Sequence, residues 1–396
     1  MRKSLIAFIT LLSCGFTETP EIKAPKEIRL LVASRKGALI ESRGHYRVYD
    51  TLSQEPLTFA NKGKRLWVEA RDEGLRLGDT LLNIKQVVFI PQDKKSTLLI
   101  DGIQYGGAVA IYSNNGKIFC VNEVNLEEYV ASVLSNKLDH KAEREALHAL
   151  AIIERTRAAY LAHTGEGKNW HAVAEDVGYT GYGSTKKKIG IEEAALATRS
   201  FILQSGKQNA PLFGFDAPWC MHSAGALAPL SSVARKVGFD SSIYTTSAFA
   251  KKDAKAAKWS YELDRSTLAK ALKVDAIKEV EVICEPKSSK VRALKIRDDE
   301  NGMHEVDFTT LQHLFGHEFV QSNTFQVMGM TKKGVLLEGT GRGIGSGLCL
   351  YSAEQMSLLG QDALEILSTF FPQTKVEKLD ALIEQAQARA QLGKKS

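Results

Sequence analysis

The sequence of 396 residues has no internal repeat and few cysteines, and no two cysteines form a CxxC pair. Apart from Cys14, the cysteines stand alone and far apart, at Cys120, Cys220, Cys284 and Cys349. A disulfide-rich scaffold and a zinc knuckle both need closely spaced cysteines. We therefore expect neither of these architectures.

A strong excess of one charge is also missing. The chain has 52 Lys and Arg residues against 46 Asp and Glu, a formal net charge of +6. Loss of residues 1–14, which contain Arg2 and Lys3 and no acidic residue, leaves 50 basic and 46 acidic residues, or +4. A nucleic-acid-binding surface needs clustered basic residues, so we expect no nucleic-acid partner. The mild positive charge suits association with an anionic envelope polymer.

The N-terminus has the pattern of an export signal. Arg2 and Lys3 precede an uncharged apolar run at residues 5–12, which is too short to span a bilayer. The run leads into "LLSC", which resembles the lipobox of bacterial lipoproteins, where cleavage precedes a cysteine that is then lipidated. We expect a signal peptide at residues 1–14, lipidation of Cys14 and a tether at residues 15–27. The expected location is the cell envelope, on a membrane facing the periplasm or the cell exterior; a plain signal peptide is the alternative.

The remaining sequence predicts an α+β fold. Residues 28–124 hold short runs of β-branched and aromatic residues between Gly, Asn and Asp, which is typical of strands. Asn115-Gly116 predicts a hairpin turn, because such a turn needs positive φ. We expect a core at residues 125–374, in which "AEREALHALAIIERTRAAYLA" is a buried helix and a mixed β region with a helical end follows. The pattern of residues 375–396 predicts an amphipathic terminal helix.

Three separated segments then resemble, in order, the motifs of the sporulation stage II protein D (SpoIID/LytB) family. The first is "VNEVNLEEYVASVL" followed by "AEREALHALAIIERTRA", and the second is "EAALATRSFILQSGK". The third is "GTGRGIGSGLCLYSAEQMSLLGQDALEILSTFFPQT". The resemblance implies a bacterial envelope protein that works on peptidoglycan. Some members of the family are lytic transglycosylases of peptide-free glycan strands, and others enhance N-acetylmuramoyl-L-alanine amidases.

A lytic transglycosylase needs one carboxylic acid, which protonates the glycosidic oxygen and then helps to deprotonate the attacking muramic acid hydroxyl. In the family this acid is a glutamate shortly after the E-E-Y helix. In "VLSNKLD" here, that position holds Lys137. A lysine cannot replace the acid at neutral pH unless its pKa is greatly lowered. Asp139 or Glu143, brought in by a change of register, is the alternative acid.

The resemblance also gives a set of candidate substrate-binding residues: Glu128, Tyr179, Tyr182, His222, Ser223, Gly341, Gly343, Gly345 and Gly347. The two tyrosines could stack on sugars or pack within their loop. The alternate glycines of "GTGRGIGSG" allow close approach of another element or of a sugar chain. Without a G-K-[ST] ending, this segment does not read as a phosphate-binding loop.

Metal and cofactor sites are not expected. Relatives with Cys and His near "CMHSAGALA" are thought to bind zinc, and Cys220 and His222 are the corresponding candidates here. Two protein ligands are fewer than zinc usually takes. We therefore predict no metal and no cofactor.

The resemblance leaves the activity open between binding and cleavage. The family's acid, His and Gln are replaced by Lys137, Ile344 and Leu350, while Glu128 is retained. This contrast favours a protein that binds glycan strands and modulates wall hydrolases, with a cell-wall amidase or a division protein as partner. A lytic transglycosylase with a displaced acid is the alternative, and a purely structural role beside a division partner is the third.

Overall fold

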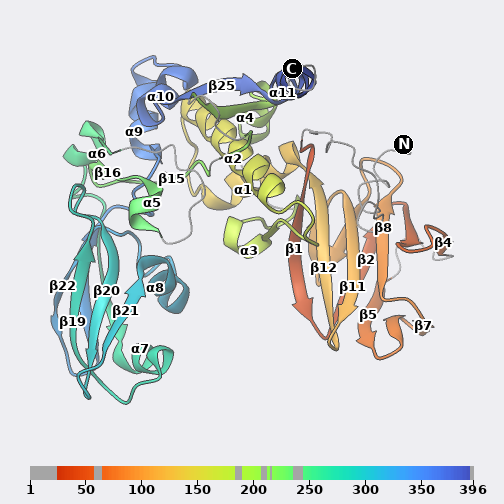
Figure 1. The fold of residues 1–396 in the computed structure, drawn as a ribbon, viewed down its shortest axis with the longest axis horizontal. Helices are drawn as coiled ribbons and strands as arrows, with labels where there is room; N and C mark the ends of the chain where they lie inside the picture. Colours follow the sequence, from red (N-terminus) through yellow and green to blue (C-terminus); the bar gives the residue numbers. More distant parts are fainter. Residues whose placement is uncertain are drawn as a thin grey trace. The chain divides into compact units, whose positions relative to one another are not determined.

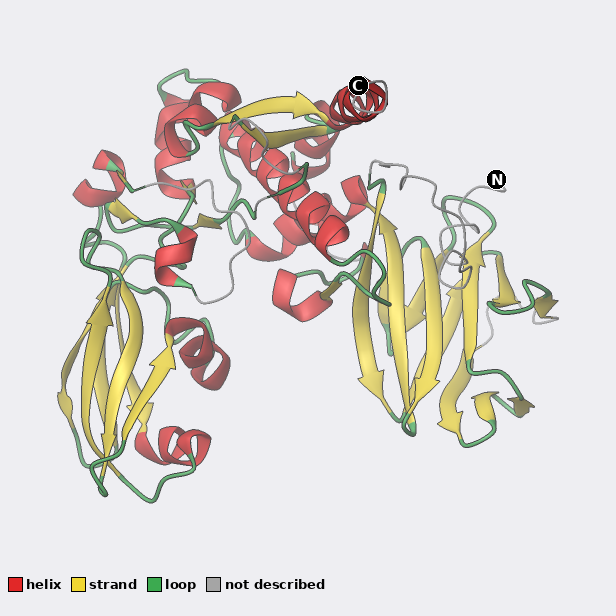
Figure 2. Ribbon diagram, viewed as in Figure 1, coloured by secondary structure: helices red, strands yellow, loops and turns green. Residues whose placement is uncertain are grey.

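The computed structural model describes residues 25–57, 65–182, 190–206, 212–214, 216–234 and 244–392. The predicted signal peptide, its lipidation site Cys14 and residues 15–24 of the predicted tether lie outside these ranges. Strands and helices share the chain in the manner of an α+β fold, which confirms the predicted class (Figures 1 and 2). In the part of the chain that the structure describes, no helix is both long and apolar enough to cross a membrane.

The chain forms two compact units, which we describe one at a time. The first unit comprises residues 1–141, 158–202 and 377–396, and the second comprises residues 142–157 and 203–376. The first unit thus joins the β-rich residues 28–124 to helical residues that we expected in the core that follows. The reason is local, because the first helix after residue 125 packs on the strands that precede it.

Two antiparallel sheets build most of the first unit. The strands of one sheet, in spatial order, are β13 (Ala172–Val173), β1 (Glu27–Arg35), β12 (Lys117–Asn125), β11 (Ala108–Asn114), β8 (Gln86–Pro91), β3 (Tyr46–Asp50) and β4 (Pro56–Leu57), with β13 parallel to β1. Those of the other are β10 (Ile103–Tyr105), β9 (Thr97–Ile100), β2 (Gly37–Arg43), β5 (Arg65–Arg71), β6 (Gly74–Leu77) and β7 (Thr80–Leu82). Strand β5 lies against β11 and β12. Asn115 and Gly116, at φ 49° and 70°, form the hairpin turn predicted between β11 and β12.

The first unit also contains helices, beside the end of α2 described below. They are α1 (Leu126–Lys137), α3 (Ala174–Val177), α4 (Ile191–Ala197) and α11 (Leu379–Leu392). Helix α1 begins where Asn125 accepts a hydrogen bond from the backbone N–H of Glu127 at 2.9 Å, a common N-cap arrangement. In α11, Leu379, Leu382 and Ile383 are buried.

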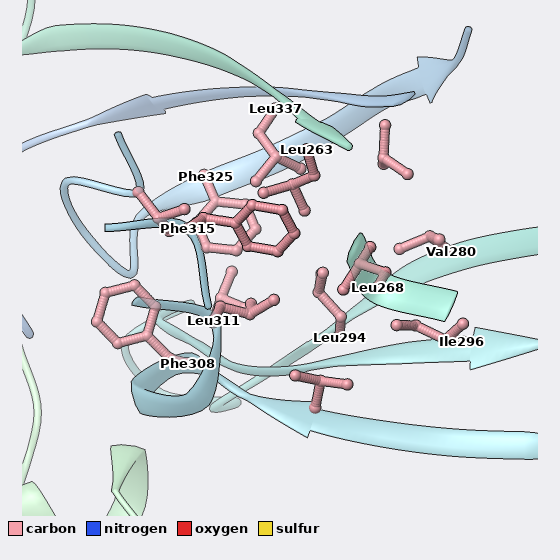
Figure 3. Packing of buried hydrophobic residues seen from close by; sticks show 14 of the residues in the cluster. Leu263, Leu268, Val280, Leu294, Ile296, Phe308, Leu311, Phe315, Phe325 and Leu337 are labelled. Atoms are coloured by element: carbon pink, nitrogen blue, oxygen red, sulfur yellow. The ribbon is translucent and has the colours of Figure 1, made fainter. Parts of the chain in front are cut away.

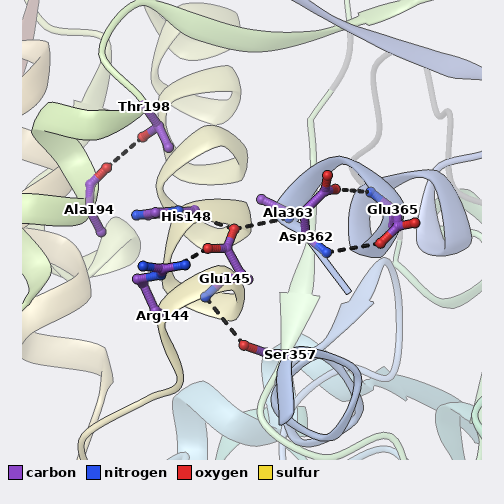
Figure 4. A network of polar contacts seen from close by, with 9 residues as sticks. All are labelled: Arg144, Glu145, His148, Ala194, Thr198, Ser357, Asp362, Ala363 and Glu365. Atoms are coloured by element: carbon purple, nitrogen blue, oxygen red, sulfur yellow. Dashed lines mark hydrogen bonds and ion pairs between the residues drawn. The ribbon is translucent and has the colours of Figure 1, made fainter. Parts of the chain in front are cut away.

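Helix α2 (Arg144–Thr164) is buried as predicted. Between residues 146 and 153 every side chain except His148 is buried. Near its start, in the second unit, Glu145 accepts a hydrogen bond from the backbone N–H of Ala363 at 3.2 Å, and its own N–H donates to Ser357 Oγ at 3.4 Å (Figure 4). These bonds tie α2 to the helices α9 (Leu350–Leu358) and α10 (Ala363–Phe370).

The second unit has its own hydrophobic core. Its larger sheets are β18-β23-β22 (Lys258–Asp264, Gly334–Thr340, Phe325–Met330) and β19-β20-β21 (Ile277–Cys284, Val291–Asp298, Met303–Asp307). Helices α7 (Arg265–Leu272) and α8 (Phe308–Phe315) pack on these strands. Figure 3 shows Phe308, Leu311 and Phe315 of α8 gathered with Leu294 and Phe325 from the strands.

Short elements complete the structure. They are α5 (Leu230–Val233), α6 (Ala248–Lys252) and the paired strands β15 with β24 (Trp219–Cys220, Leu348–Cys349), β16 with β17 (Ala226–Leu227, Thr245–Thr246) and β14 with β25 (Phe201–Ser205, Thr374–Lys378). The β15–β24 pair is parallel and joins the glycine segment to the chain around Cys220.

Candidate functional site

Glu128 lies in the first turn of α1, which the Asn125 cap fixes in place. The next residue, Tyr129, is fully buried, whereas Glu128 is exposed. Carboxylate oxygen Oε2 of Glu128 lies against Gly106, between β10 and β11, where an added Cβ would stand 3.0 Å from it. Because Gly106 has no side chain, the carboxylate has room beside the backbone.

Tyr182 borders the same position. A Cβ on Gly106 would stand 3.8 Å from Cδ2 of the Tyr182 ring, and the tyrosine is 37% exposed. A carboxylate and an aromatic ring therefore meet beside Gly106, and both reach solvent. We call Gly106, Glu128 and Tyr182 the acid–tyrosine surface.

Hydrogen bonds hold the loop of residues 178–182 that presents Tyr182. The hydroxyl of Tyr179 donates to Asn122 Oδ1 at 2.7 Å, and Ser132 Oγ of α1 donates to the carbonyl of Gly181 at 2.7 Å. Gly181 has φ +77°, and a Cβ there would stand 2.4 Å from the Gln104 carbonyl. These contacts fix the backbone on which Tyr182 stands.

Asn122 links this loop to Gly106. Its Nδ2 donates to the carbonyl of Gly106 at 2.7 Å and to that of Ala108 at 3.0 Å, while its Oδ1 accepts from Tyr179. Tyr179 itself is 5% exposed, and its ring lies 6.0 Å from that of Tyr129. A ring this buried offers no face to a ligand, so Tyr179 positions the loop and Tyr182 provides the exposed ring.

The electrostatics of the surface centre on Glu128. Burial by neighbouring atoms raises the pKa of the Glu128 carboxyl, although part of the side chain remains exposed. Among the described residues, no hydrogen bond or charged group contributes to this shift. A carboxyl whose proton is retained more readily than usual, and which reaches solvent, can donate a proton to a bound ligand.

The acid candidates near Lys137 have different surroundings. The side chain of Lys137 packs against Gly178, where an added Cβ would stand 3.1 Å from its Cε. Asp139 is exposed and lies 2.9 Å from His140 Nδ1. Glu143 is exposed and belongs to the second unit. The catalytic roles of Asp139 and Glu143 stay predictions.

The glycine segment lies in the second unit and is packed against protein atoms. An added Cβ would stand 2.7 Å from the His222 carbonyl at Gly341 and 2.8 Å from Cys220 Cβ at Gly343. It would stand 2.6 Å from Lys290 Cε at Gly345 and 1.9 Å from the Pro218 carbonyl at Gly347. All four have positive φ. Close approach of another element, one of the two readings of the spacing, accounts for these positions. The sugar-binding role of these glycines stays a prediction.

His222 and Ser223 lie beside this segment and are both buried. The Nδ1 atom of His222 accepts a hydrogen bond from the Ala224 N–H at 3.1 Å, and the imidazole ring lies 5.0 Å from that of Tyr351. Ser223 is fully buried, and its carbonyl accepts from Lys290 Nζ at 2.7 Å. Their contacts are structural, and their predicted role in substrate binding stays untested.

Cys220 and Cys349 are neighbours in the β15–β24 pair and both are buried. The backbone N–H of Ser223 and the hydroxyl of Ser352 lie 3.3 Å and 3.4 Å from Cys349 Sγ. Burial alone would raise the pKa of the Cys349 thiol, but hydrogen bonds from Cys220, Ser223 and Ser352 lower it well below its ordinary value. The same thiol contact and burial raise the pKa of Cys220.

Lys290, which we did not single out in the sequence, completes this buried cluster. Its Nζ donates to Ser223 and, at 2.6 Å, to Thr324 Oγ1, and burial lowers its pKa to about 8. Among the residues that the structure describes, no group of three or more His, Cys, Asp or Glu side chains is placed to hold a metal ion. The absence of a metal at Cys220 and His222 stays a prediction.

Sequence reasoning identified Glu128 and Tyr182 but missed Gly106 and the residues that support this surface, Asn122 and Ser132. Gly106 and Gly107 were visible as a glycine pair in "IQYGGAVAIY", but nothing local tells which side chain fills the space beside Gly106. Asn122 and Ser132 are ordinary polar residues in a strand and a helix. Their partners come from distant segments, so only the fold identifies them.

Comparisons with known proteins identify the family of the chain. The family model of SpoIID, described as a stage II sporulation protein, matches residues 114–204. An uncharacterized protein of Chlamydia pneumoniae is 36% identical over 193 residues, which cover 48% of this chain and 70% of that protein. The chain belongs to the SpoIID family. Membership supports a function related to sporulation or the cell wall.

Two further relatives extend the comparison. An uncharacterized protein of Chlamydia muridarum is 33% identical over 186 residues, covering 46% of this chain and 64% of that protein. An uncharacterized protein of Brachyspira hyodysenteriae is 26% identical over 343 residues, covering 84% of this chain and 87% of that protein. The family match includes Glu128, Tyr179 and Tyr182, whereas the glycine segment lies outside it.

Proposed function

We propose that the protein binds the glycan strands of peptidoglycan at the acid–tyrosine surface and takes part in cell-wall remodelling. The observation that carries the proposal is the meeting of the Glu128 carboxylate and the exposed Tyr182 ring beside Gly106. A sugar ring presents C–H groups to an aromatic face and hydroxyls to a carboxylate. The family-level function in the cell wall supports glycan as the ligand.

Cosedimentation with purified glycan strands tests this proposal. Strands freed of their peptides should carry the wild-type protein into the pellet, and Tyr182→Ala should reduce the bound fraction. The bound fraction on peptide-bearing strands shows whether binding needs strands without peptides. Wild-type protein that stays in the supernatant at every strand concentration would contradict the proposal.

Cleavage of the strands is the second candidate function, and the raised pKa of Glu128 favours it. As general acid, the Glu128 carboxyl would give its proton to the glycosidic oxygen as the C1–O bond breaks. The carboxylate would then take the proton of the muramic acid 6-hydroxyl as that oxygen bonds to C1. In this scheme Glu128 supplies the acid that the family places at the position of Lys137.

End-group analysis separates the two functions. Cleavage by this route leaves 1,6-anhydromuramic acid ends, which chromatography with mass spectrometry detects. Glu128→Gln should remove them while keeping strand binding. If the wild-type protein binds strands but leaves no such ends, it is not a lytic transglycosylase. If Lys137→Glu then produces ends, the site lacks only the family's own acid.

We also propose the cellular setting that the N-terminus indicates. Export, lipid attachment at Cys14 and modulation of a cell-wall amidase or a division protein follow from the signal pattern and the family resemblance. Labelling of cells with a radioactive fatty acid should mark the protein, and Cys14→Ser should lose the label. A labelled Cys14→Ser variant would contradict lipidation at this residue.

A further inference from the structure

The six-stranded sheet of the first unit has an outward face that the acid–tyrosine surface does not use. Alternate residues of a strand point to opposite sides, and paired residues on antiparallel strands share a side. One face of β2 and β5 is buried and apolar: Ala38, Ile40 and Val68. The other face presents Gly37, Leu39, Glu41, Arg65, Trp67, Glu69 and Arg71.

Trp67 is the dominant apolar side chain of this face and is 50% exposed. Leu39, its partner across the β2–β5 pair, is 36% exposed. The core of the sheet is formed by the opposite face, so the fold does not require an indole here. A large exposed aromatic group on a regular strand is a common feature of binding surfaces.

Gly37 makes room for the indole. A Cβ on Gly37 would stand 2.7 Å from Cζ2, 2.9 Å from Cε2 and 3.0 Å from Nε1 of Trp67. The ring therefore occupies the space of the missing side chain. Its Nε1 donates to Glu69 Oε2 at 3.2 Å, which holds the ring in this position.

Paired charges surround the indole. Glu69 accepts from Arg71 Nε at 3.0 Å and lies 3.5 Å from Arg76 Nη1. Glu41 accepts from Arg65 Nε at 2.6 Å. Glu41 also lies 3.6 Å from Arg43 Nε, so the two carboxylates have four arginine partners. The face therefore offers hydrogen-bond donors and acceptors around an aromatic ring, with more basic than acidic groups.

We propose that this face, centred on Trp67, is a second saccharide-binding site that takes sugar residues of a glycan strand. A neutral sugar matches both features of the face, because its C–H groups stack on the indole and its hydroxyls bond to the paired Glu and Arg side chains. The identity of the ligand rests on the proposed function, whereas the location of the site rests on Trp67 alone.

Titration of the full chain with chitotetraose, an oligomer of N-acetylglucosamine, tests this site. In a ¹H–¹⁵N spectrum, the indole N–H signal of Trp67, assigned by its loss in Trp67→Phe, should shift with saturation. By calorimetry, Trp67→Ala should bind at least about tenfold more weakly. Gly37→Ala should weaken binding similarly, because the new methyl group displaces the ring while Trp67 is still present. Met303→Ala, at an exposed apolar residue of the second unit, is the control and should bind within twofold of wild type.

The outcomes distinguish this site from the proposed function. If Trp67→Ala and Gly37→Ala bind chitotetraose as wild type does, the Trp67 site is overturned, and strand binding lost in Tyr182→Ala still supports the acid–tyrosine surface. If only the Trp67 variants lose binding, the Trp67 site stands and the acid–tyrosine surface fails. An indole signal that does not move at saturating chitotetraose also overturns the Trp67 site. Circular dichroism of each variant checks that the fold is retained.

Discussion

The two units use similar kinds of side chain in opposite ways. In the first unit Glu128 and Tyr182 reach solvent, and buried polar groups such as Asn122 hold the segments that present them. In the second unit, the cluster beside the glycine segment is itself buried, with Lys290 1% and Cys349 0% exposed. The acidic and aromatic side chains of the first unit can therefore contact a ligand, whereas the cluster around Cys349 in the second unit packs within the protein.

The largest loss of stability is expected for a substitution in the glycine segment. Gly347→Ala places a methyl group 1.9 Å from the Pro218 carbonyl at φ +70°, so we expect a loss of more than about 3 kcal/mol in the free energy of unfolding. Denaturant titration measures this loss, and hydrogen exchange should localise it to the second unit.

Gly360 supplies the matched control for this substitution. It also has positive φ, at +88°, but an added Cβ would meet no atom within 4 Å. Gly360→Ala should therefore lose only about 1 kcal/mol, from backbone strain alone. Equal losses in the two variants would mean that strain, and not packing against residue 218, explains the glycine at position 347.

A smaller effect is expected in the network under the acid–tyrosine surface. Tyr179→Phe removes the hydroxyl that donates a hydrogen bond to the buried Asn122 Oδ1. We expect this to lower the free energy of unfolding by about 1–3 kcal/mol. Because the loop then loses one of its anchors, strand binding through Tyr182 should also weaken. Cosedimentation and denaturant titration of the same sample measure both. Weakened stability with unchanged binding would show that the loop does not need this bond.

Acid pH should lower the stability of the first unit through His171. Burial and the charge of Arg29 lower the pKa of His171 in the first unit from 6.5 to about 3. Between these values the unfolded chain binds the proton and the folded chain does not, so stability is retained above pH 6.5 and falls as the pH is lowered.

The expected slope from His171 is at most about 1.4 kcal/mol per pH unit. Hydrogen exchange of β11 and β12, measured from pH 7 to pH 4, should show this loss in wild type and a flatter profile in His171→Gln. Identical profiles for the two proteins would show that His171 does not cause the loss of stability at acid pH.

Local patterns predicted much of the fold. The change of composition at residue 125, the Asn-Gly turn and the apolar circumference of α2 each depend on neighbouring residues, and each appears in the structure. The spacing of the glycines correctly indicated close approach, because glycine at positive φ leaves a local signature. It did not tell which element approaches, and the structure identifies the strand around Cys220 and the side chain of Lys290.

The site was harder to predict, because its contacts join distant residues. Glu128 was identified by a motif, but its position beside Gly106 and Tyr182 depends on how α1, two strands and a loop come together. The pairing of Cys220 with Cys349 likewise depends on a parallel strand register that no short pattern contains. Tyr179 packs within its loop, one of the two alternatives that the sequence left open, whereas Tyr182 is exposed.

The most direct test of the central claim compares two equally exposed tyrosines, one from each unit. Tyr182 is 37% exposed and Tyr244, in the second unit, is 38% exposed. In equilibrium cosedimentation with peptide-free glycan strands, Tyr182→Ala should bind about tenfold more weakly than wild type, about 1.4 kcal/mol, with the fold retained. Tyr244→Ala should bind as wild type does. Equal binding by the two variants, or a larger loss in Tyr244→Ala, would contradict the assignment of the glycan site to the first unit.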